Sequence, residues 1–219
     1  KTRTHQPFYY KNSYLIFNGE IYNYKSLRNE LKSLGHKFFT KSDTEVLIHC
    51  LKHWGMSALD KLEGMWSFAW FDENSSKLYI ARDRFGEKPL YFFKNNKVFY
   101  FASEIKPLTK LANYNYSINH KKLLNFMING YKSIYKKNKN FIKNINEVEK
   151  GSFLEIDLKL NIRCKSYWNR KIIQNTNLSY QDAVAQTREL LIDSVRKQLN
   201  SDVPLAFCMS GGIDSNSLI

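Results

Sequence analysis

The segment SGGIDS, residues 210–215, has the residue types of a loop that holds phosphate. Gly211 and Gly212 lack a Cβ, so their backbone can adopt positive φ and approach a ligand closely, with successive N–H groups around an anion. Asp214 would repel a bare phosphate, but it suits a loop that also holds Mg²⁺. The segment contains no Gly-Lys-Ser/Thr, so it is not a Walker A loop. A plain turn before a helix cap is the alternative interpretation.

The segment FNGEIYN, residues 17–23, contains a second group of possible donors. Asn-Gly is the commonest two-residue hairpin turn, and we expect the strand before it to end there. A helical pattern follows instead of a paired strand, which favours a second interpretation: the Asn18 side chain and the Gly19 N–H form an oxyanion hole. Asp43 is either a helix N-cap or a carboxylate that pairs with a substrate ammonium.

Short helices and strands must position these residues. A strand at 13–19 precedes two helices, at 23–35 and 42–55, whose apolar residues recur at helical spacing. Aromatic-rich strands, a helical stretch and a closing hairpin follow, at residues 65–72, 77–83, 89–93, 97–103, 104–127 and 151–168. Two helices followed by a run of strands predict an α+β fold with an antiparallel sheet.

The last fifty residues have a different pattern. Residues 171–179 are polar and read as a linker, and residues 180–199 have the periodicity of an amphipathic helix. Residues 203–209 form an apolar run that is typical of a buried parallel strand. A strand, a glycine-rich turn and the start of a helix together predict the first unit of a doubly wound α/β domain.

Five segments, in this order and spacing, resemble the glutaminase domain of class II glutamine amidotransferases. They are FNGEIYNYKSLRNEL, SDTEVLIHCL, LEGMWSFAWFD, ARDRFGEKPLYF and FASEIKPL. SGGIDS resembles the pyrophosphate loop of ATP pyrophosphatases, which narrows the resemblance to glutamine-hydrolysing asparagine synthetases and their close relatives. It implies a partial αββα Ntn-hydrolase-like glutaminase domain at 1–168 without its N-terminal strands, a linker at 169–179, and the beginning of an asparagine synthase (ATP pyrophosphatase) domain at 180–219.

The resemblance also implies roles for individual residues. Asn18 and Gly19 match the oxyanion-hole pair, and Glu20 and Asp43 complete the implied glutamine-binding set. The implied ATP and pyrophosphate site consists of Met209, Ser210, Gly211, Gly212, Asp214 and Ser215, with Asp214 as the implied Mg²⁺ ligand. A further signature of the family, formed by Arg82, Asp83, Gly86 and Pro89, is interpreted as a tight structural turn between strands.

The implied function is that of a ligase that makes an amide with glutamine-derived ammonia. Glutamine, aspartate and ATP would be the substrates, with Mg²⁺ as cofactor, and asparagine would form through an acyl-adenylate with release of AMP and pyrophosphate. A homodimer is a possible assembly. Relatives with an inactive glutaminase domain close a β-lactam ring and others amidate sugars or peptides, so these alternatives stay open. The family's nucleophile is an N-terminal cysteine, whereas residue 1 is Lys1; we therefore expect a fragment cut at both ends and inactive alone.

The cysteines and two of the histidines have structural interpretations. Cys50, Cys164 and Cys208 are odd in number and scattered, which predicts no disulfide framework, and we expect all three to be small core residues. His49 and His53 are spaced i, i+4 on a predicted helix and could grip a metal. No third ligand is evident, which favours a solvated helix face.

The formal net charge of +14 suggests a further alternative, a basic binding module without catalysis. The densest basic segment, residues 131–144, interleaves aromatic residues and lysines as single-strand binders do. Elsewhere the lysines are spread along the chain without a nucleic-acid-binding motif, so we expect no nucleic-acid partner. No apolar run is long enough to span a membrane, and the cysteine usage fits a reducing cytoplasm.

Overall fold

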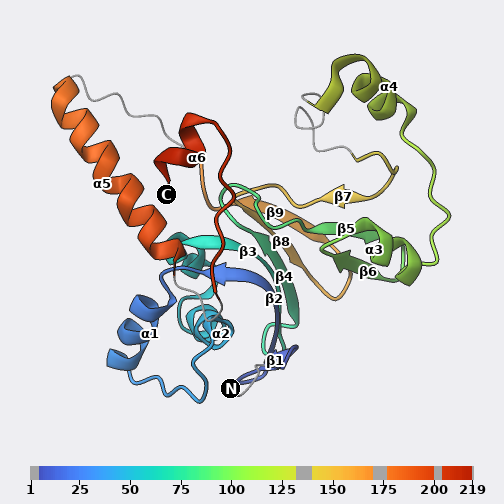
Figure 1. The fold of residues 1–219 in the computed structure, drawn as a ribbon. Coiled ribbons are helices and arrows are strands. Elements are labelled where there is room, and N and C mark those ends of the chain that lie inside the picture. The colour runs from blue at the N-terminus through green and yellow to red at the C-terminus, as the bar shows by residue number, and fades with distance from the viewer. Residues whose placement is uncertain (1–4, 132–139, 170–176, 200–203, 219) are drawn as a thin grey trace. The chain divides into compact units, whose positions relative to one another are not determined.

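The computed structural model describes residues 5–131, 140–169, 177–199 and 204–218 (Figure 1). The chain divides into two compact units, Lys1–Asn169 and Arg170–Ile219. The middle of the predicted basic segment, residues 132–139, and most of the predicted linker, residues 170–176, lie outside the described residues.

Two antiparallel sheets form the first unit. The larger sheet has the strand order β1-β2-β3-β4-β8-β9 and the smaller has the order β6-β5-β7. The strands are β1 (Phe8–Tyr9), β2 (Ser13–Ile21), β3 (Gly64–Asp72), β4 (Lys77–Arg82), β5 (Tyr91–Lys94), β6 (Phe99–Ala102), β7 (Asn146–Glu147), β8 (Ser152–Ile156) and β9 (Ile162–Ser166). The antiparallel pairing is as predicted. The aromatic-rich strands do not form one meander, because β3 and β4 belong to the larger sheet and β5 and β6 to the smaller.

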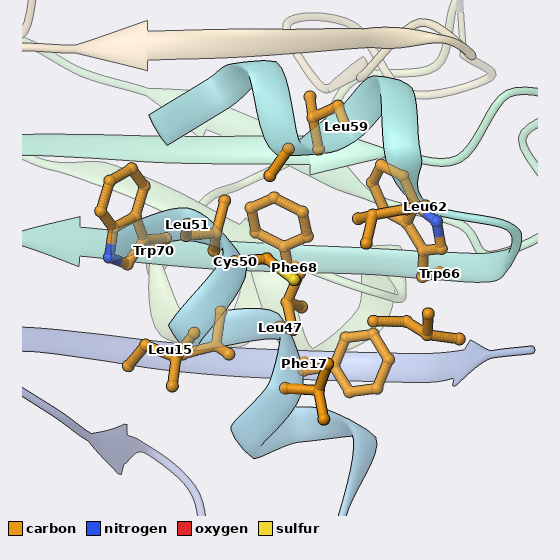
Figure 2. Close-up of a cluster of buried hydrophobic side chains, with 14 of the residues drawn as sticks. Leu15, Phe17, Leu47, Cys50, Leu51, Leu59, Leu62, Trp66, Phe68 and Trp70 are labelled. Atoms are coloured by element: carbon orange, nitrogen blue, oxygen red, sulfur yellow. The ribbon is translucent and has the colours of Figure 1, made fainter. Parts of the chain in front are cut away.

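Two helices cover one face of the larger sheet, α1 (Tyr24–Ser33) and α2 (Asp43–Trp54), and the 3₁₀ helix η1 (Gly55–Lys61) follows them. Strand residues alternate between the two faces of a sheet. Trp66, Phe68 and Trp70 of β3 accordingly share one buried cluster with apolar residues of α2 (Figure 2). This cluster is the main core of the unit.

The opposite face of the larger sheet packs against the smaller sheet. Ala69 of β3 and Ile80 of β4 share a second buried cluster with Leu90 and the partly buried aromatic residues of β5 and β6. Helix α3 (Ile105–Leu111) covers the outer side of the smaller sheet, and α4 (His120–Asn129) follows it. The layers are helix, sheet, sheet and helix, which confirms the predicted αββα arrangement.

A tight turn carries the chain from the larger sheet to the smaller one. Asp83 is fully buried, and its carboxylate accepts hydrogen bonds of 2.7–3.2 Å from the backbone N–H groups of Trp66, Phe85, Gly86, Glu87 and Lys88. The Arg82 guanidinium donates to the carbonyl oxygens of Gly86 and Lys88. The structural interpretation of this signature is therefore confirmed: the two charged side chains replace a regular hydrogen-bond ladder where the chain changes sheets.

The second unit contains α5 (Tyr180–Gln198) and α6 (Ile213–Ser217). The helix predicted at 180–199 is confirmed. The predicted buried strand at 203–209 is wrong, because its described residues, 204–209, are exposed and have no regular secondary structure. A strand needs a neighbour for its backbone groups, and the described residues of this unit contain no other strand.

The prediction of three core cysteines holds only for Cys50. This residue is fully buried, and burial raises the pKa of its thiol to about 12. Cys164 and Cys208 are exposed. Cys164 lies on β9, which is at the edge of its sheet, and Cys208 lies in the segment without a strand. As to membranes, none of the described helices is long and apolar enough to cross one.

Candidate functional site

The strand β2 presents a row of backbone groups on the side away from β3, which we call the β2 edge (residues 17–21). Alternate residues of an antiparallel strand direct their backbone groups to the same side. Phe17 exchanges hydrogen bonds of 2.8 and 2.9 Å with the Gln6 side chain, and the Ile21 N–H donates to Asp43 Oδ2 at 3.2 Å. Gly19 lies midway between Phe17 and Ile21. Its N–H therefore points to the β2 edge, beside Asp43.

The conformation of Gly19 requires glycine. Its φ is +143°, and a Cβ placed here would lie 2.1 Å from the carbonyl oxygen of Met65. Gly19 pairs with Trp66, and β2 continues to Ile21. The predicted turn at Asn18–Gly19 is therefore wrong. Because Gly19 has no side chain, the backbone of β3 can approach it closely, and the chain does not reverse there.

The Asn18 side chain lies on the face of β2 that is turned toward the smaller sheet. Its Nδ2 donates to Ser103 Oγ at 3.2 Å, across the space between the two sheets. Both residues line a cleft of about 300 Å³. The lining comprises Ile16, Asn18, Ser67, Phe68, Ala69, Leu90, Phe101, Ala102 and Ser103. Asp43 is not among these residues, so the structure relates Asp43 to Gly19 and not to the Asn18 side chain.

Asp43 is the first residue of α2. The N-cap is Ser42, whose hydroxyl accepts from the Thr44 N–H at 3.1 Å, so the N-cap alternative for Asp43 is wrong. Burial raises the pKa of the Asp43 carboxyl, against the opposing effect of hydrogen bonds from the N–H groups of Ile21 and Thr44. A cation beside the carboxylate would offset the cost of burying its charge. This environment suits a substrate ammonium.

Glu20 is exposed on the same face of β2 as Asn18. Burial, followed by the charges of Glu87 and Glu20, raises the pKa of the nearby Tyr22 hydroxyl. The end of β2 is therefore an acidic region. Sequence reasoning missed Gln6 and Ser103, which contact this region across separations of 11 and 85 residues. Nothing in the local pattern around either residue marks such a contact.

The loop at 210–215 runs into α6 in the second unit, and no strand passes through it. The hydroxyl oxygens of Ser210 and Ser215 are 2.9 Å apart, and the Gly212 N–H donates to Ser210 Oγ at 3.2 Å. Neither glycine uses the positive φ that is open to it: Gly212 has φ −84°, and Gly211 is also outside that region. The serine hydrogen bonds close the loop without it. A Cβ on Gly211 would meet nothing within 4 Å, which leaves open space around the loop.

The donor set of this loop fits a magnesium–polyphosphate group. Asp214 and Met209 are both exposed beside the loop. Mg²⁺ is usually held by one or two carboxylates together with phosphate oxygens, and Asp214 supplies one carboxylate. In the part of the chain that the structure describes, no three His, Cys, Asp or Glu side chains come together as a metal site. A metal at Asp214 would therefore need the phosphate oxygens as further ligands.

The predicted solvated helix face is wrong for His49, although His53 is exposed. His49 is fully buried, and its ring stacks on those of Tyr10 and Phe38 at centroid distances of 4.1 and 4.4 Å. His36, from the loop between α1 and α2, contacts both of these histidines. Its Nδ1 lies 2.9 Å from His49 Nδ1, and its Nε2 lies 3.0 Å from His53 Nδ1. Since its two ring nitrogens face different partners, the three histidines cannot converge on one metal ion.

Comparison with known families gives two matches. The glutamine amidotransferase domain family matches residues 1–168, and the asparagine synthase family matches residues 186–219. Glutamine-hydrolyzing asparagine synthetase 2 of Bacillus subtilis (strain 168) is 38% identical over an alignment 220 residues long, which covers 96% of this chain and 29% of that protein. Glutamine-hydrolyzing asparagine synthetase 1 of the same strain is 38% identical over an alignment 218 residues long, which covers 98% of this chain and 33% of that protein. The chain thus spans about a third of the length of the curated relatives it matches.

Two solved structures resemble the chain in fold. The glutamine phosphoribosylpyrophosphate amidotransferase from B. subtilis, complexed with ADP and GMP, aligns with a TM-score of 0.54 and 23% identity, over 75% of this chain and 32% of that one. The allosteric regulatory enzyme of purine biosynthesis aligns with a TM-score of 0.53 and 22% identity, over 72% and 29% of the two chains. At these identities the likeness concerns the fold alone.

Proposed function

The chain belongs to the glutamine amidotransferase domain family, and we propose that the protein containing it makes an amide with ammonia released from glutamine. Glutamine is hydrolysed at the β2 edge, and ATP activates the acceptor at the loop of residues 210–215. Aspartate is the proposed acceptor, because two relatives that are 38% identical to this chain are named asparagine synthetases. It would react as an acyl-adenylate, with asparagine, AMP and pyrophosphate as the products.

The spacing along the β2 edge is the observation that carries this proposal. Gly19 and Ile21 are two residues apart, about 7 Å at the rise of an extended strand. The Asp43 carboxylate lies 3.2 Å from the Ile21 nitrogen. In an extended glutamine, standard bond lengths separate the amide oxygen from the α-amino nitrogen by about 6 Å. One glutamine can therefore accept from the Gly19 N–H while its ammonium pairs with Asp43.

These residues would bind and orient the glutamine while its amide is attacked. Negative charge develops on the amide oxygen when a nucleophile adds to the carbonyl, and neutral donors aimed at that oxygen stabilise it. Gly19 N–H and the Asn18 carboxamide are the proposed donors, and the Glu20 carboxylate is a further proposed contact of the glutamine. Cys50 is unsuited to be the nucleophile, because it is buried and its thiol has a pKa of about 12.

The loop of the second unit is proposed to hold the polyphosphate of ATP. Ser210 and Ser215 now bond to each other, and both hydroxyls can turn outward to phosphate oxygens. Gly211 leaves open space for those oxygens. Asp214 would share an Mg²⁺ with them, and Met209 would contact the nucleotide. Bound ATP would supply the pyrophosphate leaving group.

The protein expressed from its full reading frame tests the proposal. With glutamine, aspartate and magnesium ATP, we expect glutamate, asparagine, AMP and pyrophosphate to form in equal amounts. Formation of AMP and pyrophosphate with a sugar or peptide acceptor, but not with aspartate, would refute the acceptor assignment. Synthesis with free ammonia but not with glutamine would refute the assignment of the β2 edge.

A further inference from the structure

One hydrogen bond joins the two sheets at the proposed oxyanion donor. Asn18, on β2 of the larger sheet, donates through Nδ2 to the hydroxyl of Ser103, the residue after β6 of the smaller sheet. The donor–acceptor distance is 3.2 Å, and the bond spans the cleft that both residues line. The smaller sheet thus contacts the functional end of an asparagine side chain.

A carboxamide without a partner is a poorly aimed donor. Its last torsion is broad, and its oxygen and nitrogen can exchange places by a half turn. A hydrogen bond from Nδ2 to Ser103 fixes the plane of the Asn18 amide and occupies one of its two N–H groups. No other hydrogen bond of the Asn18 side chain is found among the described residues. The second N–H is therefore held in a fixed direction and is available to a ligand.

The neighbouring serine does not have this role. Ser67 faces Asn18 directly in the pairing of β2 with β3, and it lines the same cleft. Its hydroxyl donates to the carbonyl oxygen of Pro89, at 3.4 Å, rather than to Asn18. Of the two serines beside Asn18, Ser103 is the one that holds the carboxamide.

We propose that Ser103 is a positioning residue for glutamine hydrolysis, which acts by aiming the Asn18 carboxamide at the oxyanion. This inference rests on the proposed function of the β2 edge. It assigns the smaller sheet a part in the reaction, since the end of β6 sets the direction of a donor on β2. Because the developing charge appears only after nucleophilic attack, a misaimed donor affects the chemical step more than it affects glutamine binding.

Steady-state kinetics of glutamate release by the full-length protein tests this role. We expect Ser103→Ala to lower kcat by roughly 10-fold with the KM for glutamine within about 2-fold of wild type. Ser103→Thr, which keeps a hydroxyl, should recover most of the loss. Ser67→Ala is the matched control, since it removes a hydroxyl from the same cleft, and it should leave kcat within about 2-fold of wild type.

A double-mutant cycle separates this inference from the proposed function. In an Asn18→Ala background, Ser103→Ala should lower kcat by less than about 2-fold, because the group it positions is gone. Two outcomes would overturn the positioning role and leave the proposed function intact. One is that Ser103→Ala lowers kcat in the Asn18→Ala background as much as it does in the wild-type protein. The other is that Ser103→Ala alone has the wild-type kcat. Wild-type kcat for Asn18→Ala, or no glutamate release by the wild-type protein, would refute the site itself. If Ser103→Ala does not fold, Ser103→Cys takes its place, with an intermediate kcat expected because a thiol is a weaker hydrogen-bonding group.

Discussion

His49 provides a quantitative test of the core, because a neutral imidazole is enclosed there. Its ring lies between Tyr10 and Phe38, and its Nδ1 faces that of His36. Burial, followed by the charge of His36, lowers the pKa of His49 from 6.5 to about 4. The charge of Glu45 opposes this shift in the pKa, and the charges of Lys11 and Arg28 contribute to it. The fold therefore favours the uncharged ring.

The sign and size of the pH effect follow from this pKa. Between pH 6.5 and 4 the unfolded chain binds a proton at His49 that the folded chain does not, so the free energy of unfolding falls as the pH falls through this range. The linkage relation gives a loss of about 2 kcal/mol between pH 7.5 and pH 5 for this one group. Most of the loss occurs below pH 6.5, the value for the unfolded state.

Urea unfolding of the 219-residue chain at a series of pH values measures this loss. His49→Phe keeps an aromatic ring between Tyr10 and Phe38 and removes the titrating group. We expect the change in unfolding free energy between pH 7.5 and pH 5 to be about 2 kcal/mol smaller in this variant than in wild type. His120→Gln, at an exposed residue of α4, is the control and should retain the wild-type pH dependence. Equal pH dependence in wild type and His49→Phe would refute the account of a buried neutral histidine.

Three further substitutions test other parts of the structure. Gly19→Ala should lower the free energy of unfolding by about 3 kcal/mol in urea, because φ is +143° and the new Cβ would meet the Met65 carbonyl; an effect below about 1 kcal/mol contradicts the close approach. Asp83→Ala should cost about 4 kcal/mol by the same measurement, because it leaves buried N–H groups unpaired. A small effect would show that the turn does not depend on this carboxylate. Asp214→Asn should raise the KM for magnesium ATP in amide synthesis by about 10-fold with glutamate release unchanged, and an unchanged KM would remove Asp214 from the site.

The sequence was sufficient for the elements with strong local signals. The helix caps, the helical spacing of Leu27 and Leu31, and the aromatic runs of β3 to β6 predict the helices and strands that the structure contains. These signals act within a few residues of each other, so they can be read along the chain.

The errors have a common physical origin in distant contacts. Asn18–Gly19 has the composition of a turn, but pairing with a strand some fifty residues away keeps it extended. His49 has the spacing of a metal pair on an open helix face, but Tyr10 and Phe38 cover it. The apolar run at 203–209 has the composition of a buried strand, yet a strand forms only when a neighbour satisfies its backbone. Such contacts leave no periodic signal in the sequence.

The central claim is that Asp43 holds the glutamine ammonium on the β2 edge. Its most direct test is to measure the KM for glutamine of the full-length Asp43→Asn variant. The control is Asp60→Asn, which replaces an exposed carboxylate of η1. We predict a KM raised by about 10- to 100-fold in Asp43→Asn, because a charge-assisted hydrogen bond is lost, with amide synthesis from free ammonia unchanged. A KM equal to that of wild type and of Asp60→Asn would contradict the claim.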